Sequence, residues 1–201
     1  MTTKDLFRCI GDLSDTMLEE AADIRRKKRW LPIAALAACA VAWKFGISGE
    51  TAAAALAEFH GAGRRLEYKG SFHGADVYDD YAHHPNELHA LLQAVRLMHY
   101  RRVICAFQPH TYSRTKALFQ SFVDELRTAD QVVLADIYAA REQNTVGVSS
   151  QELAAEIPGA VYCPSLQGVT AYLRENAQPG DIILTVGAGD IYKAGEALFT
   201  E

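Results

Sequence analysis

Residues 103–107 read Val-Ile-Cys-Ala-Phe and residues 182–186 read Ile-Ile-Leu-Thr-Val, and these two runs decide the fold. Both are short and apolar throughout, as strands are when helices cover both faces of their sheet. Outward from them, strand-like segments alternate with helical ones. The predicted strands are 102–108, 131–136, 160–163 and 181–186, and the predicted helices are 85–99, 113–127, 150–156, 166–176 and 191–199. This alternation predicts an α/β fold with a Rossmann-like, mostly parallel sheet and helices on both faces.

Other segments precede this alternating series. Residues 66–69 and 75–81, with Gly70 and Gly74 as turn signals, predict a β-hairpin. Residues 31–62 are Ala-rich with helical spacing and run up to the helix stop Gly61-Ala62-Gly63. Residues 1–30 predict an amphipathic helical segment that ends in a basic run. We therefore expect three parts, at 1–30, 31–62 and 63–201.

The basic run at 25–29 is followed by apolar residues at 30–41, an order that resembles a membrane anchor with its positive charges inside. The apolar stretch is short for a membrane span, and Lys44 interrupts it soon afterwards. We interpret it as a buried helix of a soluble bundle. Membrane contact through residues 24–45 is the alternative.

Charge and cysteine usage narrow the class of protein. The formal net charge of −5 argues against broad nucleic-acid binding, which needs a surplus of Lys and Arg on some face. The four cysteines show no paired spacing, and Cys105 lies in an apolar run that is typical of a buried thiol. The first thirty residues are mostly polar and predict no signal peptide. These features favour a cytoplasmic location.

Polar and ionisable residues gather in the loops that follow the predicted strands, at 79–85, 108–115, 136–142 and 187–190. Ligands of open α/β sheets bind at the carboxyl ends of the strands, so this distribution predicts a binding or catalytic rim there. A zinc site is a weaker interpretation, because His83 and His84 are adjacent and no HExxH-like spacing occurs. Its candidate ligands would be His73, His83, His84, His89 and His110. We expect no metal ligands in this chain.

Five longer motifs occur in and just before these loops. They are Gly-Arg-Arg-Leu-Glu at 63–67, Asp-Asp-Tyr-Ala-His-His-Pro at 79–85, Phe-Gln-Pro-His-Thr-Tyr-Ser-Arg-Thr at 107–115, Asp-Ile-Tyr-Ala-Ala-Arg-Glu at 136–142 and Gly-Ala-Gly-Asp-Ile at 187–191. In this order they resemble the Mur ligase family. The resemblance covers about 34 to 199 and implies that residues 63–201 form the family's C-terminal domain. Residues 31–62 resemble the end of its central ATP-binding domain, whereas residues 1–30 do not resemble the family.

Within the family, the resemblance is to the alanine-adding members, which act in peptidoglycan synthesis. It implies an ADP-forming ligase that uses ATP and Mg²⁺ to convert the carboxylate of UDP-N-acetylmuramate to an acyl phosphate, which the amino group of L-alanine then attacks. ATP and Mg²⁺ would be held mainly by the family's central domain. The Gly-rich loop of that domain, ending in Gly-Lys-Thr or Gly-Lys-Ser, occurs nowhere in these 201 residues. We therefore expect no ligase activity from this chain alone.

The resemblance also implies roles for single residues. Arg65 would contact the phosphates of ATP, with Arg64 able to exchange roles with it. Asp79 would accept hydrogen bonds from the nucleotide ribose. Tyr81 and His83 would line the L-alanine site. His83 is the candidate catalytic proton acceptor, because imidazole titrates near neutral pH.

Arg114 would bind the carboxylate of L-alanine through its guanidinium fork, with His110 and Tyr138 as further lining residues. Some family members carry Arg where this chain has Thr111, so one carboxylate contact is expected to be absent or bridged by water. The alternative function is a non-catalytic binding module built on a ligase-like domain, with a membrane tether in residues 24–45.

Overall fold

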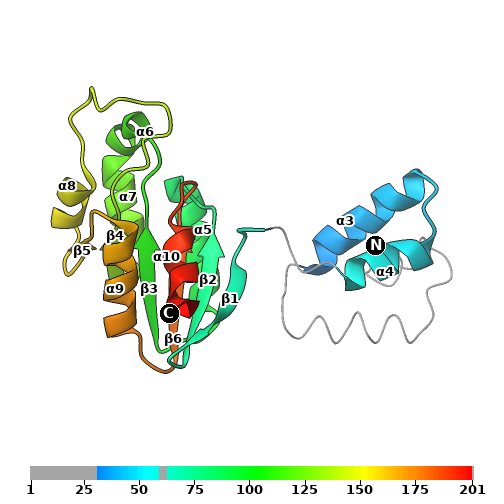
Figure 1. The fold of residues 1–201 in the computed structure, drawn as a ribbon. Helices are drawn as coiled ribbons and strands as arrows, with labels where there is room; N and C mark the ends of the chain where they lie inside the picture. The colour runs from blue at the N-terminus through cyan, green and yellow to red at the C-terminus, as the bar shows by residue number, and fades with distance from the viewer. Residues whose placement is uncertain (1–30, 59–62, 201) are drawn as a thin grey trace. The chain divides into compact units, whose positions relative to one another are not determined.

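The computed structural model describes residues 31–58 and 63–200, and the chain divides into two units between His60 and Gly61 (Figure 1). The amphipathic segment predicted at 1–30 lies outside the described residues. Two helices are described in the first unit, and the second unit contains the sheet.

The first unit holds the helices α3 (Leu31–Lys44) and α4 (Gly49–Ala57). Gly46 adopts a positive φ of 75° just after α3, and Ser48 begins α4 by accepting a hydrogen bond from the N–H of Thr51. From residue 38 to residue 58 no side chain is buried, and Trp43 is 68% exposed. The side chains described in this unit therefore do not form the buried helix that the sequence predicted. In the described part of the chain, every helix is too short or too polar to cross a membrane.

The second unit is built on one six-stranded sheet. Its strands are β1 (Glu67–Phe72), β2 (Ala75–Asp80), β3 (Arg102–Phe107), β4 (Gln131–Leu134), β5 (Val161–Tyr162) and β6 (Asp181–Val186). They lie in the order β1-β2-β6-β3-β4-β5, with β1 antiparallel to β2 and the other neighbouring pairs parallel. The predicted mostly parallel sheet is confirmed, and the hairpin adds one antiparallel edge strand.

Helices cover both faces of this sheet (Figure 1). They are α5 (Pro85–Arg96), α6 (Tyr112–Ala117), α7 (Phe119–Leu126), α8 (Ser150–Ala155), α9 (Leu166–Asn176), α10 (Tyr192–Glu196) and the 3-10 turn η1 (Ala197–Phe199). Successive residues of β3 point to opposite faces. Cys105 belongs to the core shared with α5, α7 and α8, whereas Ile104 belongs to the core shared with α9 and α10. A core on each face explains why the central strands are apolar throughout.

Two elements differ from the sequence-based expectation. The helix predicted at 113–127 is interrupted at Leu118, whose φ of −114° and ψ of 20° are not helical, so α6 and α7 are separate helices. The hairpin turns at His73 and Gly74, which both have positive φ. Gly70 instead lies within β1 at an irregularity of the strand register. These differences depend on local backbone angles that hydrophobic periodicity does not encode.

Candidate functional site

The loops after β2, β3, β4 and β6 meet at the carboxyl edge of the sheet. The N–H of Gly187 donates to the carbonyl of Asp80 over 3.0 Å, which joins the loop after β6 to the end of β2. The N–H of Thr111 donates to the carbonyl of Tyr138 over 2.9 Å, which joins the loops after β3 and β4. The four loops therefore form one rim.

Four rings and one guanidinium gather on this rim. The ring of His83 lies edge-on to Tyr81, with 5.5 Å between centroids, and its centroid is 6.0 Å from that of His110. His110 stacks on Tyr138 at 5.6 Å, and Nη1 of Arg114 lies 3.4 Å from Nδ1 of His110. None of these five residues is buried. The structure thus brings together the five residues predicted to line an amino-acid site, from the loops after β2, β3 and β4 and from the start of α6.

Thr111 carries backbone strain at the centre of this cluster. Its φ of 68° and ψ of 143° lie in a region that favours glycine and that β-branched residues rarely adopt. The buried hydroxyl of Thr115 donates to the carbonyl of Thr111 over 2.7 Å, and Tyr138 accepts the Thr111 N–H. These bonds hold the strained loop, and with it His110 and Arg114, in a fixed position against Tyr138.

His110 is a poor proton acceptor in this setting. Burial lowers the pKa of His110, the charge of Arg114 and the imidazole of His83 lower it further, and Glu142 opposes them only in part. Because a guanidinium can only donate, Nδ1 of His110 faces Arg114 as an acceptor. His110 is therefore a neutral ring that lines the site without adding positive charge.

The side chain of Arg64 is turned into the protein. Its Nε donates to Oδ2 of Asp79 over 2.7 Å, and its other nitrogens donate to the carbonyls of Gly187 and Gly189 over 2.7 and 3.1 Å. The guanidinium also lies 5.0 Å from the centroid of the Tyr81 ring. Arg64 therefore ties the end of β2 to the loop after β6, and its donors are used within the fold.

Arg65 and Asp79 occupy contrasting positions. Arg65 is exposed, and its charge acts on the carboxylates of Asp80 and Glu87. Asp79 is fully buried, and its second oxygen accepts a hydrogen bond from the hydroxyl of Thr185 over 2.8 Å. For Asp79 to accept a hydrogen bond from a ribose hydroxyl, its present partners would therefore have to move. The contact of Arg65 with phosphate stays a prediction, and its exposure suits that role better than the position of Arg64 does.

Gln108 is a rim residue to which the sequence analysis gave no role. Its Oε1 accepts hydrogen bonds from the N–H groups of Asp190 and Ile191 over 2.9 and 3.1 Å, and its Nε2 donates to Oδ1 of Asp190 over 3.1 Å. A Cβ at Gly189 would overlap this Oε1 and would lie 2.8 Å from the Cβ of Tyr138. Glycine is therefore required at 189 by close approach. The sequence signal was a polar residue directly after an apolar strand, but its partner lies 82 positions away.

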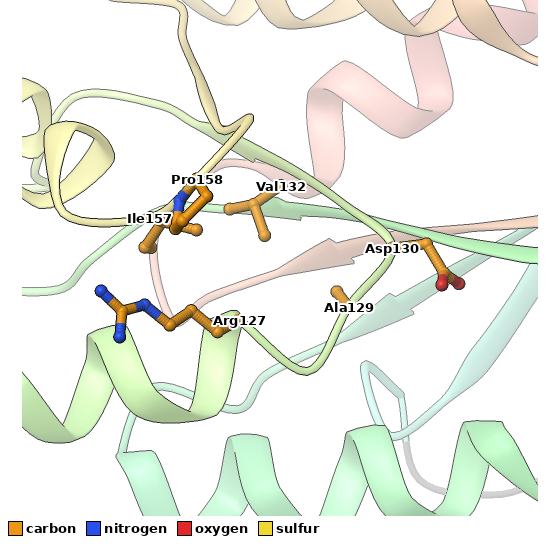
Figure 2. A pocket seen from close by; sticks show the side chains of 6 residues that line it. All are labelled: Arg127, Ala129, Asp130, Val132, Ile157 and Pro158. Atoms are coloured by element: carbon orange, nitrogen blue, oxygen red, sulfur yellow. The ribbon is translucent and has the colours of Figure 1, made fainter.

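A separate hollow of about 340 Å³ opens elsewhere on the second unit (Figure 2). It is lined by Arg127, Ala129, Asp130, Val132, Ile157 and Pro158. Asp130 immediately precedes β4, so the hollow lies at the amino end of the sheet, away from the rim. Both charges in it are engaged, since Arg127 donates to the carbonyl of Glu156 and Asp130 accepts the N–H of Val103. We assign no ligand to it.

The chain resembles known proteins over most of its length. Residues 64–189 match the family described as Mur ligase, glutamate ligase domain. The chain is 45% identical over 171 residues to UDP-N-acetylmuramate–L-alanine ligase of Caldanaerobacter subterraneus subsp. tengcongensis, covering 83% of this chain and 37% of the relative. It is 48% identical over 167 residues to the protein of that name from Lachnospira eligens, covering 81% and 36%. The chain thus spans little more than a third of the length of these relatives.

Among solved structures, UDP-N-acetylmuramate-alanine ligase MurC from Thermotoga maritima shares the fold. The TM-score is 0.64 at 26% sequence identity, and the match covers 82% of this chain and 35% of that chain. The family match begins at Arg64 and ends at Gly189, so it includes all five residues of the rim cluster. Because this match covers more than half of the sequence, the chain belongs to the Mur ligase family, with residues 64–189 as its glutamate ligase domain.

Proposed function

We propose that this chain is the C-terminal domain that presents the amino acid in an ATP-dependent, ADP-forming ligase joining L-alanine to UDP-N-acetylmuramate in peptidoglycan synthesis. The observation that carries the proposal is the rim cluster of Tyr81, His83, His110, Arg114 and Tyr138. A small amino acid needs a cation for its carboxylate, a base for its ammonium group and a surface for its side chain, and the cluster offers all three. The named relatives supply the choice of L-alanine and UDP-N-acetylmuramate.

Arg114 is the group we assign to the carboxylate of L-alanine. Among the described residues, only its Nη1 has partners, at 3.4 and 3.5 Å from Nδ1 and the carbonyl oxygen of His110. The rest of its fork is free to take two carboxylate oxygens, which is the strongest geometry for such a pair. Arg64 has the same chemistry, but each of its three nitrogens already donates a hydrogen bond, to Asp79, Gly189 or Gly187.

The reaction on this side of the site is removal of protons from an ammonium group. L-alanine must lose one proton before its nitrogen lone pair attacks the carbonyl carbon of the acyl phosphate, and we assign that proton to His83. The C–N bond forms and the C–O bond to the phosphate breaks. The departing phosphate takes the second proton from nitrogen, so the products are an amide, inorganic phosphate and protonated His83.

ATP and Mg²⁺ would activate the sugar carboxylate, and we assign them mainly to the family's central domain, whose Gly-rich loop ending in Gly-Lys-Thr or Gly-Lys-Ser is not among these 201 residues. In the residues that the structure describes, no group of three or more His, Cys, Asp or Glu side chains is placed to bind a metal ion. We assign only Arg65 to the nucleotide phosphates. We place the reaction in the cytoplasm, where ATP and nucleotide-linked precursors are available.

Reconstitution tests the proposal. The purified chain is mixed with the portion of the Caldanaerobacter relative that precedes the matched region, and ADP release and product mass are followed with ATP, UDP-N-acetylmuramate and L-alanine. We expect alanine-dependent ligation by the mixture and none by the chain alone. Direct binding of L-alanine to the chain is measured in parallel by NMR titration, with Arg114→Lys expected to weaken it about tenfold or more because the bidentate fork is lost.

If the chain is folded but neither binds L-alanine nor complements the relative, the ligase assignment is wrong and the binding-module alternative takes its place. ADP release by the chain alone would contradict the expectation that the ATP site lies outside it.

A further inference from the structure

We propose that Glu87 is the positioning residue for His83, and that it makes Nε2 of His83 the atom that receives the proton from L-alanine. The inference rests on the proposed function, and it deepens it by adding a residue and by choosing between the two nitrogens of the ring. Three observations carry it: the anchoring of the carboxylate, the neighbours of each ring nitrogen, and the contrast with His110.

Glu87 is held in place by the start of α5. It is the third residue of that helix, and its Oε2 accepts hydrogen bonds from the N–H groups of His83 and His84 over 2.9 and 3.2 Å. This capping box fixes the carboxylate on the side of His83, where Oε2 lies 3.4 Å from Nδ1 of the ring. A residue that looks like an ordinary helix cap therefore also places a negative charge beside an imidazole.

The neighbours of Nδ1 decide which nitrogen carries the hydrogen. Nδ1 of His83 lies 3.0 Å from the carbonyl oxygen of Tyr81 and 3.4 Å from the Glu87 carboxylate. Neither oxygen can donate, so Nδ1 carries the hydrogen, and in the neutral ring Nε2 keeps the lone pair. Nε2 has no hydrogen-bond partner among the described residues. It is the nitrogen available to a substrate.

The charges around His83 support this assignment. Burial acts to raise the pKa of Glu87, but the His83 N–H and imidazole, the His84 N–H and the charge of Arg65 together lower it, so Glu87 stays ionised at neutral pH. Of the other rings against His83, Tyr81 comes from its own loop and His110 from the loop after β3. The carboxylate of Glu87 therefore balances the positive charge that His83 gains with the proton.

His110 shows the opposite arrangement. Its Nδ1 faces the guanidinium of Arg114 and keeps its lone pair, and the cation opposes a second proton. The two imidazoles of the rim thus differ in their charged neighbours. His83 lies beside the carboxylate of Glu87, and His110 lies beside the guanidinium of Arg114. His83 is suited to accept a proton, and His110 is suited to remain neutral.

Imidazole NMR of the full chain tests the proposal without any need for ligation. Two-bond nitrogen–proton correlations identify the tautomer of each ring, and His83→Gln assigns the His83 signals. We expect the Nδ1–H tautomer for His83. In Glu87→Gln, which keeps an oxygen for the capping box but loses the charge, we expect the Nε2–H tautomer of His83 to gain population, because the carboxylate no longer favours the hydrogen on Nδ1.

Glu152→Gln is the matched control. Glu152 completes the same capping box at the start of α8, where Ser149 is the N-cap and no imidazole is involved. Glu152→Gln should leave the tautomer populations of His83 unchanged, while it affects the stability of α8 as Glu87→Gln affects the stability of α5. An Nε2–H tautomer in the wild type, or equal tautomer populations in the wild type and Glu87→Gln, would overturn the proposal.

The reconstituted ligase separates this inference from the function on which it rests. Glu87→Gln should lower kcat, with little change in KM for L-alanine. Loss of ligation in the wild-type mixture would refute the proposed function. Ligation by the wild-type mixture with an equal kcat in Glu87→Gln would refute only the role of Glu87.

Discussion

Nε of Arg64 and Oδ2 of Asp79 lie 2.7 Å apart, in an ion pair whose carboxylate is fully buried and whose guanidinium is 22% exposed. The second carboxylate oxygen is taken by the hydroxyl of Thr185 in β6. A buried charge of this kind is tolerated only while its partners remain, because the bare carboxylate has lost its hydration. The pair therefore fastens the first residues of the second unit to the centre of the sheet.

Removing either of the two adjacent arginines should have very different effects. Arg64→Ala leaves the Asp79 charge without its partner, and we expect it to lower the free energy of unfolding by about 3 kcal/mol. Arg65→Ala changes an exposed side chain, and we expect a loss of less than about 0.5 kcal/mol. Urea unfolding of both variants at neutral pH measures the difference. Equal losses would show that Arg64 is not the structural arginine.

Gly189 should tolerate no side chain. In Gly189→Ala the new Cβ meets Gln108 and Tyr138, so we expect a loss of about 1–3 kcal/mol from overpacking. We also expect displacement of the Tyr138 ring, visible in its NMR signals. Gly168→Ala is the control, because the added Cβ lies in α9 at an ordinary 3.4 Å from Ser165 Oγ. That variant should be as stable as wild type or more so, since alanine favours a helix.

The backbone strain at Thr111 should lower the free energy of unfolding of the protein. Thr111→Gly removes the unfavourable conformation, and we expect the free energy of unfolding to rise by about 1 kcal/mol. Thr115→Val removes the hydroxyl that donates to the Thr111 carbonyl, and we expect a fall of about 1 kcal/mol. Thermal and urea unfolding of Thr111→Gly and Thr115→Val should therefore show changes in the free energy of unfolding that have opposite signs. A fall in both variants would mean that Thr111 is not strained.

The stability of the second unit should depend on pH through His110. Because burial, Arg114 and His83 lower its pKa, the unfolded chain takes up a proton near pH 6.5 while the folded protein resists it. This contribution to stability is present above that pH and is lost as the pH falls toward the folded pKa. We therefore expect the wild type to lose more stability than His110→Gln between pH 7.5 and pH 5.5. Unfolding curves at both pH values measure this loss of stability. A larger loss in His110→Gln than in the wild type would contradict the prediction.

The sequence predicted the fold well because the signals for its main elements are local. Strand β6 and helix α9 were predicted with their observed bounds, and α5 begins at Pro85 as expected. The break at Leu118 was missed because one non-helical residue leaves the apolar spacing on either side intact. Hydrophobic periodicity predicts where a helix or strand lies, but it does not predict the backbone angles of a single residue.

The rim was predictable only as a set of loops. The loops after the predicted strands and the motif resemblance selected Tyr81, His83, His110, Arg114 and Tyr138, which do lie together. The difference between Arg64 and Arg65 could not be read from their sequence, because it depends on Gly187 and Gly189, more than 120 positions away. The hydrogen bonds of Gln108 with Asp190 and Ile191 could not be predicted for the same reason. Pairings across a sheet are set by topology, which adjacent residues do not reveal.

The strand order β1-β2-β6-β3-β4-β5 also bears on how the protein is made. Strand β6 is the last to be synthesised, yet it lies between β2 and β3. Until residues 181–186 leave the ribosome, the hairpin and the β3–β5 half have no strand between them, although α5 and α7 can still pack together. Tyr81 and His83 belong to one half, and His110 and Arg114 to the other. A nascent chain paused before residue 181 would therefore carry every residue of the rim cluster while the strand between β2 and β3 is still missing, and insertion of β6 would complete the sheet beneath that cluster.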